Sequence, residues 1–195
     1  MFTGVIRHLG QVVSRKKHAD QTLLEISSSL SSKLKKGDSI AVNGVCQTVI
    51  SHQGPSFTVE LMPETLRVTT LGKLIAGTIV NLELPLKLSD TIDGHLLSGH
   101  VDSIGEITAI KSLQNAKLLT VKFPGSIKKY IARKGSIAID GISLTIVDVK
   151  SKEFTVSIVS HTLKNTNLKQ AKPGMKVNLE IDLVARYLES LLTTK

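Results

Sequence analysis

An internal duplication is the feature that most constrains what this chain can fold into. Four blocks of the first half recur in the second half, in the same order. The first pair is offset by 95 residues, as Gly4 and Gly99 show, and the other three by 97, as Gly44 and Gly141 show. The paired blocks are residues 2–12 and 97–107, 34–49 and 131–147, 57–71 and 154–168, and 76–84 and 173–181. Because a repeated sequence predicts a repeated structure, the 195 residues divide into two similar units.

Within each half, the blocks show the alternation that is typical of β-strands. The segments SIAVNG and SIAIDG, and FTVELM and FTVSIV, alternate around β-branched residues. Asn43-Gly44 and Asp140-Gly141 are dipeptides typical of tight hairpin turns. About six short strands in each half predict an all-β fold of two tandem antiparallel barrels. The segments LSSKLKKG and IKKYIARKG predict matching short helices that plug or cross each barrel.

The stretch that follows the second half breaks the repeat. Residues 183–195 read LVARYLESLLTTK, and Asp182 stands where a helix N-cap belongs. The apolar side chains on one face of this predicted helix are Leu183, Val184, Tyr187, Leu188 and Leu191. We therefore divide the chain into a barrel over 1–92, a barrel over 93–182 and a helix over 183–195. We expect this helix to pack on its copies in other subunits; the alternative is that it seals its own barrel.

Composition and charge narrow the class of protein. The net charge of +9 raises the question of nucleic-acid binding, but the basic residues are scattered. An RNA-binding module would need aromatic and basic residues on one strand face, whereas the repeated strands carry Val, Ile and Thr. A positive surface that attracts an anionic metabolite explains the charge equally well. The single cysteine excludes an internal disulfide and a cysteine-based zinc site. We see no signal peptide and no long apolar run, so we expect a cytoplasmic protein without a membrane span.

Two similar barrels with matching loops predict two similar ligands, one for each half. Gly4 and Gly99 stand at matching positions, where a flat ring could approach the backbone and hydrogen-bond through a uracil-like edge. On the strand after each turn, alternate side chains emerge on the same face. The small polar side chains expected in the two pockets are Cys46, Thr48 and Thr65 in the first and Ser143, Thr145 and Thr162 in the second.

The chain resembles the riboflavin synthase family of the alpha-chain type, which carries a lumazine-binding repeat. The resemblance covers essentially the whole chain and rests on the combination of MFTG, NGVCQTV, MPETLR, GHLLSGHVD, KGSIAIDGISLTIV and VNLEID. It implies two six-stranded Greek-key barrels per subunit and a C-terminal helix that holds a homotrimer. It also implies a reaction in which two molecules of 6,7-dimethyl-8-ribityllumazine dismutate. One donates a four-carbon unit to the other, which yields riboflavin and 5-amino-6-(D-ribitylamino)uracil.

The resemblance further implies how the site is built. No cofactor or metal is needed, and the active site lies between the N-terminal barrel of one subunit and the C-terminal barrel of a neighbour. Proximity would be the main catalytic device, because two heterocycles stacked in register need no bimolecular collision. The C7 methyl of one lumazine must lose a proton, and a nucleophile or hydroxide can add at C7 of the other. Which barrel holds the donor, and which residue is the base, stay open, as does association with lumazine synthase.

Particular residues match the family's site. His100 is expected to move protons, Cys46 to assist proton transfer or nucleophile addition, Ser39 and Asp182 to lie near the reacting centre, and Phe2 to cover a ring at the subunit junction. Residues of the first half expected to bind substrate are Gly4, Val5, Ile6, Cys46, Gln47, Thr48, Glu60, Leu61, Met62, Pro63, Glu64 and Thr65. Those of the second half are Gly99, His100, Val101, Lys134, Ser143, Leu144, Thr145, Val159, Ser160, His161, Thr162, Leu163 and Lys164.

Several of these residues also have a simpler interpretation. Cys46 could be a small buried hydrophobe, His100 could hydrogen-bond across the barrel seam, and Lys134 could be a surface lysine. His161 stands where the family often has a carboxylate-bearing residue, which leaves ribityl contacts there open. The spacing of His95 and His100 in a strand-like context does not favour zinc, and the role of His95 stays open. The alternative function is a non-catalytic lumazine- or flavin-binding protein.

Overall fold

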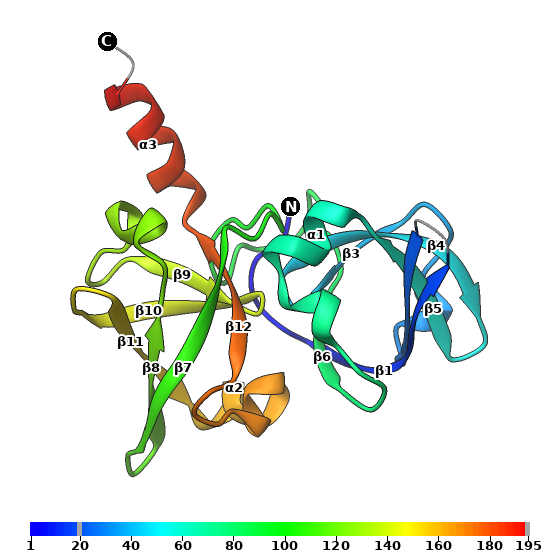
Figure 1. Ribbon diagram of the computed structural model, residues 1–195, viewed down its shortest axis with the longest axis horizontal. Helices are drawn as coiled ribbons and strands as arrows, with labels where there is room; N and C mark the ends of the chain where they lie inside the picture. The colour runs from blue at the N-terminus through cyan, green and yellow to red at the C-terminus, as the bar shows by residue number, and fades with distance from the viewer. Residues whose placement is uncertain (19–20, 194–195) are drawn as a thin grey trace.

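The structure is a computed structural model, and it describes residues 1–18 and 21–193. Over these residues the chain forms two closed antiparallel barrels of six strands each, followed by a C-terminal helix (Figure 1). The prediction of two tandem β-barrels is therefore confirmed. The last two residues of the helix expected over 183–195 lie outside the described residues.

The two barrels have the same strand order. The first follows the order β1-β2-β5-β4-β3-β6, and pairing of β6 with β1 closes it. Its strands are β1 (His8–His18), β2 (Gln21–Ser27), β3 (Ser39–Val42), β4 (Val45–Gln53), β5 (Ser56–Leu61) and β6 (Ile79–Glu83). The strands of the second are β7 (Ser103–Ser112), β8 (Ala116–Lys122), β9 (Ser136–Ile139), β10 (Ile142–Val149), β11 (Glu153–Val159) and β12 (Lys176–Ile181). These occupy the places of β1 to β6 in turn, so the duplication in the sequence is a duplication in the structure.

The two predicted hairpin turns meet at the centre of the molecule. Asn43 and Asp140 have φ of 45° and 47°, and the glycine after each has φ of 77°. Positive φ at both central residues is the type I′ geometry that joins twisted strands. A Cβ atom on Gly44 would lie 2.5 Å from the backbone nitrogen of Gly141. Glycine is therefore required at these turns both by the backbone angle and by the contact between the barrels.

Each barrel encloses its own apolar core, and short helical turns close it. The segments predicted to plug the barrels contain 3₁₀ turns, η1 (Ser31–Lys33) and η3 (Gly125–Tyr130), which are short as expected. Apolar side chains in and beside them are buried, Leu30 and Leu34 in the first barrel and Ile127 in the second. Four further helical elements follow β5 and β11, and the sequence did not predict them as helices: α1 (Pro63–Val68), η2 (Thr70–Lys73), α2 (Ser160–Asn165) and η4 (Asn167–Gln170).

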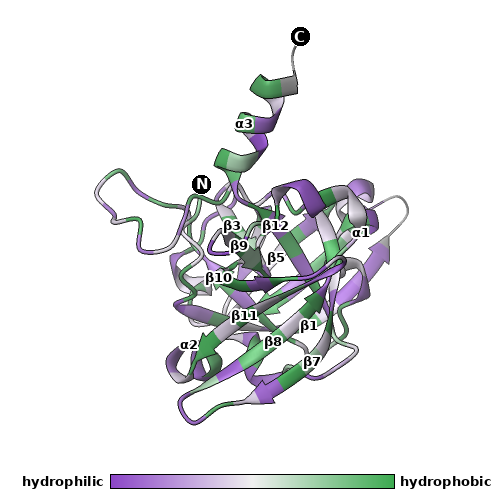
Figure 2. Cartoon of the chain, turned by 90° about the vertical axis from the view of Figure 1, so that its left-hand side faces the viewer, coloured by the Kyte–Doolittle hydropathy of each residue, from purple (hydrophilic) through white to green (hydrophobic). Residues whose placement is uncertain are grey.

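Helix α3 (Leu183–Thr193) projects away from both barrels (Figure 1). Figure 2 shows hydrophobic positions along it that no other element covers. Val184, Tyr187, Leu188 and Leu191 are between 54% and 75% exposed. The alternative that this apolar face seals its own barrel is therefore wrong. No helix in the described part of the chain is long and apolar enough to cross a membrane.

Candidate active site

Each half of the chain sends an extended arm onto the barrel of the other half. The arm at residues 97–101 lies on the first barrel, where the Cys46 N–H donates to the Gly99 carbonyl at 2.9 Å. Val101, at the end of this arm, packs against the core of the first barrel. We call the strand face around Cys46, together with this arm, the first half-site. It contains a strand from one half and a backbone segment from the other.

The second half-site repeats this arrangement around Ser143. The arm at residues 2–6 lies on the second barrel, where the Ser143 N–H donates to the Gly4 carbonyl at 2.9 Å. Ile6 packs against the core of the second barrel. The two arms also pair with each other, since the N–H groups of Phe2 and Leu97 donate to each other's carbonyls at 2.8 and 3.0 Å. The two half-sites therefore have the same construction, and they adjoin where the two arms pair.

The arms approach the strands so closely that only glycine fits at the contact. A Cβ atom on Gly99 would lie 2.6 Å from the Cβ of Cys46, and one on Gly4 would lie 2.6 Å from the Cβ of Ser143. Both glycines also have positive φ, 81° and 77°. The observed reason for glycine here is therefore contact between arm and strand. Admission of a ligand ring at the same place stays a prediction.

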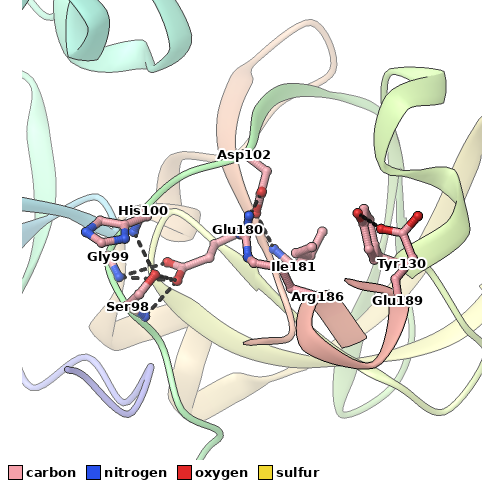
Figure 3. A network of polar contacts seen from close by, with 9 residues as sticks. All are labelled: Ser98, Gly99, His100, Asp102, Tyr130, Glu180, Ile181, Arg186 and Glu189. Carbon is pink, nitrogen blue, oxygen red and sulfur yellow. Dashed lines mark hydrogen bonds and ion pairs between the residues drawn. The ribbon is translucent and has the colours of Figure 1, made fainter. Parts of the chain in front are cut away.

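A carboxylate at the end of each barrel's last strand holds the adjoining arm. Glu83 accepts hydrogen bonds from the N–H and hydroxyl of Thr3 at 2.7 and 2.8 Å. Glu180 accepts hydrogen bonds from the N–H and the hydroxyl of Ser98, both at 2.7 Å, and from the N–H of Gly99 at 3.2 Å (Figure 3). Burial raises the pKa of Glu83, and the bonds from the arm oppose this. Sequence reasoning missed both residues, although a glutamate in the apolar repeats VNLEL and VNLEI was a usable signal.

The first half-site brings together several of the predicted residues. Cys46 is half-buried on the outer face of β4, and Thr48 lies next along that face and pairs across to Ser39 on β3. Burial raises the pKa of the Cys46 thiol, and the chain's ammonium terminus and a hydrogen bond from Ser39 oppose this. The thiol is therefore protonated at neutral pH and is a weak donor rather than a thiolate nucleophile. His100 follows Gly99 on the arm and is exposed.

The second half-site contains a histidine to which the sequence assigned no role. Nδ1 of the His95 ring lies 2.7 Å from the Ser143 hydroxyl. The backbone N–H of His95 donates to the Thr3 carbonyl at 3.1 Å. Burial lowers the pKa of His95, and the charge of Asp182 opposes this. Asp182 is the N-cap of α3, as predicted, because its Oδ1 accepts the Val184 N–H at 2.9 Å. Nε2 of His95 is buried without a partner among the described residues.

The structure separates the candidate acid–base groups of one protomer into two clusters. Ser39, Cys46 and His100 belong to the first half-site, whereas His95 lies with Ser143 in the second, and the charge of Asp182 acts on His95. Among the described residues, no group of three or more histidine, cysteine and acidic side chains is placed to hold a metal ion. The chemistry available from these groups is proton transfer and hydrogen bonding, together with the positioning of a ligand.

The other predicted binding residues lie around the half-sites in different ways. Gln47, Leu61 and Leu144 are buried, on the face of their strands that points into the barrel. Residues 62–65 follow β5 and enter α1, whereas Val159 is the last residue of β11 and residues 160–164 lie in α2. Ser160, Leu163 and Lys164 line a cavity of about 280 Å³ beside the β7–β8 hairpin. Lys134 is exposed, has φ of 66°, and donates its N–H to the Ile146 carbonyl at 2.8 Å.

Comparison with known proteins gives one consistent answer. The family model of the lumazine binding domain matches residues 3–85 and again residues 98–182. A riboflavin synthase of Actinobacillus pleuropneumoniae is 42% identical over 196 residues, covering 100% of this chain and 91% of that protein. A riboflavin synthase of Bacillus subtilis is 40% identical and covers 98% of this chain and 90% of that protein. A riboflavin synthase of Mycobacterium tuberculosis is also 40% identical, with 98% of both chains covered.

Solved structures agree on the fold. The crystal structure of LumP complexed with riboflavin matches with a TM-score of 0.87 at 22% identity, over 93% of this chain and 99% of that chain. The complex of LumP with 6,7-dimethyl-8-(1'-D-ribityl) lumazine matches over the same shares with a TM-score of 0.84. The family rests on the domain match and on the relatives at about 40% identity. This chain belongs to the riboflavin synthase family and carries the family's lumazine binding domain twice.

Proposed function

We propose that this protein is a riboflavin synthase that converts two molecules of 6,7-dimethyl-8-ribityllumazine into riboflavin and 5-amino-6-(D-ribitylamino)uracil. The observation that carries the proposal is the pair of twin half-sites in a chain whose full-length relatives are riboflavin synthases. A reaction between two identical heterocycles calls for two similar sites. Holding both rings in register can supply on the order of 7–11 kcal/mol of the barrier at best.

The two half-sites are similar but not equal, and this suits a reaction in which one molecule donates and the other accepts. The first offers the neutral thiol of Cys46 and the exposed imidazole of His100. The second offers the hydroxyl of Ser143, hydrogen-bonded to the neutral imidazole of His95. We assign His100 to proton transfer at the C7 methyl group, because its imidazole is exposed beside the Cys46 strand and an imidazole nitrogen can act as general base and then as general acid. The protonated thiol is suited to donating a hydrogen bond to a ring.

We propose further that the complete active site forms between protomers of a homotrimer. Within its own chain, the charge of Asp182 acts on His95 of the second half-site, and we infer that Ser39 and His100 meet an Asp182 from a neighbour. The exposed apolar face of α3 supports assembly, since Val184, Leu188 and Leu191 would be buried against copies of themselves. Association with lumazine synthase and a cytoplasmic location stay predictions, as do the domain limits at 92 and 182.

A product assay tests the proposal. Purified protein is incubated with 6,7-dimethyl-8-ribityllumazine alone, and riboflavin and the uracil product are quantified by chromatography. The expected result is one riboflavin for every two lumazines consumed, with no added cofactor. A non-catalytic lumazine-binding protein would instead bind the ligand and leave it unchanged. A His100→Ala variant with full turnover would contradict the role assigned to this imidazole.

A further inference from the structure

Carboxylates fix both ends of the segment that carries His100. Residues 98–102 form no strand and lead into β7. At one end, Glu180 holds Ser98 through two hydrogen bonds of 2.7 Å. At the other end, the Asp102 N–H donates to the Leu179 carbonyl at 2.8 Å, and Oδ2 of Asp102 accepts the Ile181 N–H at 2.9 Å (Figure 3). His100 therefore lies on a short bridge whose two ends are bound to β12.

Asp102 also joins this bridge to helix α3. Its Oδ1 accepts a hydrogen bond from Nη2 of Arg186 at 2.7 Å, and the Asp102 side chain is only 12% exposed. Arg186 lies one turn beyond Asp182, and its N–H donates to the Asp182 carbonyl at 3.3 Å. The ion pair thus lies between two candidate catalytic residues, His100 and Asp182. Because Asp102 is shielded from water, the pair is screened less than a pair exposed on both sides.

The next turns of α3 are attached to the same barrel by a second polar contact. Glu189 bonds to Lys129 of η3. It also bonds to Tyr130 of the same turn, on the side of the helix that faces its own barrel (Figure 3). The apolar face, with Leu188 and Leu191, stays exposed. Polar contacts with the barrel thus set the direction in which α3 leaves it.

The duplication provides an internal comparison for this ion pair. At the offset of 95 residues, the counterpart of His100 is Val5 and the counterpart of Asp102 is Arg7. Arg7 pairs with Asp93 at 3.4 Å, and the side chains are 71% and 51% exposed. The arm of the first half carries Val5 in place of the histidine, and its ion pair, Arg7 with Asp93, is exposed to solvent. The shielded pair that reaches α3 occurs on the arm that carries the histidine.

We propose that Arg186 is a positioning residue for His100. Acting through Asp102, it fixes the bridge 98–102 against the first turns of α3, and so sets where His100 and Asp182 stand on the protomer. The proposal rests on the proposed function, since it assigns a role within that reaction. Chemical steps between bound molecules are sensitive to displacements of an ångström, so loosening the bridge should lower kcat more than it raises KM.

Four variants test this: Arg186→Ala, Arg186→Lys, Asp102→Asn and the double variant of Arg186→Ala with Asp102→Asn. The control is Lys176→Ala, which removes an ion pair with Glu106 on the same barrel, with side chains 51% and 36% exposed. We expect kcat to fall about tenfold in Arg186→Ala and in Asp102→Asn, with KM within about twofold and the oligomer intact by sedimentation. The double variant should be no slower than either single variant, because both remove one interaction. Arg186→Lys should recover most of the rate, and Lys176→Ala should not change it.

A second readout is independent of turnover. Hydrogen exchange of the amides in residues 98–102 should be faster in Arg186→Ala than in the wild type and unchanged in Lys176→Ala. The proposal is overturned if kcat is unchanged, if the two single effects multiply, or if the rate falls only together with dissociation of the oligomer. If the wild type makes no riboflavin, the proposed function fails. Faster exchange at 98–102 would then still support the coupling of this bridge to α3, and unchanged exchange would refute it.

Discussion

A buried carboxylate between the barrels leads to a prediction about stability and pH. Asp140, in the turn of the second barrel, is 1% exposed, and burial raises its pKa from an ordinary 3.8 to about 6. Hydrogen bonds from Asn178 and Asn167 oppose this rise. Its counterpart in the first barrel is Asn43, which is uncharged and accepts the Asn81 N–H at 2.8 Å just as Asp140 accepts the Asn178 N–H at 2.8 Å. Asp140→Asn therefore copies a residue that the duplicated fold already uses.

The magnitude follows from the two pKa values. Between pH 3.8 and about 6 the folded chain holds a proton on Asp140 that the unfolded chain has released, so the free energy of unfolding falls as pH rises. At 1.36 kcal/mol for each pH unit between the two pKa values, the loss is about 3 kcal/mol once the pH is above 6. The asparagine carries no charge and escapes this loss. It does forfeit the bond that Asn167 Nδ2 donates to Oδ2 of Asp140 at 2.8 Å, at a cost of about 1–2 kcal/mol at every pH.

Urea denaturation of both proteins from about pH 4 to about pH 7.5 tests this reasoning. The free energy of unfolding of Asp140→Asn minus that of the wild type should rise by about 3 kcal/mol from the acidic to the neutral end of this range. The variant should be less stable than the wild type at the acidic end and somewhat more stable at the neutral end. The control is Asp148→Asn, whose carboxyl is exposed on β10. A difference between Asp140→Asn and the wild type that does not change with pH would refute the account of this carboxyl.

Three further predictions concern the half-sites and α3. Gly99→Ala should lower the free energy of unfolding by about 2–4 kcal/mol, because the added Cβ meets Cys46 at 2.6 Å and φ is 81°; unchanged thermal unfolding would contradict this. Alkylation of Cys46 by iodoacetamide, followed by mass spectrometry, should be slow at neutral pH and should still be accelerating as the pH passes 9.0, the ordinary thiol value, because burial raises the thiol pKa; a rate that has levelled off below that pH would contradict this. Leu188→Glu should dissociate the proposed homotrimer in sedimentation experiments and abolish turnover while the barrels stay folded, since it puts charge into the apolar face of α3.

The sequence predicted what depends on local pattern and on repetition. Alternation around Ile40 and Ile137, and the Asn-Gly and Asp-Gly turns, were sufficient for the strands and for two like barrels. The capping role of Asp182 was also predicted, because an N-cap is a local feature. The short helices α1 and α2 were not, because six residues are too few to show a helical period.

The exchange of arms was not predictable from these patterns. Contacts such as Gly4 with Ser143 and Gly99 with Cys46 join residues far apart in the chain, and no local propensity specifies them. Glu83 and Glu180 were visible as charges in apolar strands, yet their role depends on where the arms lie. His95 precedes the first paired block of the second half, so comparison of the two halves gave no signal for it.

The mechanism that we propose requires each half-site to be completed by a half-site of another protomer. The direct test mixes two impaired variants, His100→Ala and Asp182→Ala, under conditions in which subunits exchange. At an interface between the two, an intact His100 from one chain would face an intact Asp182 from the other. Turnover in the mixture should therefore rise well above that of either variant alone. Mixed oligomers, verified by native mass spectrometry, that show only the parental activities would contradict it.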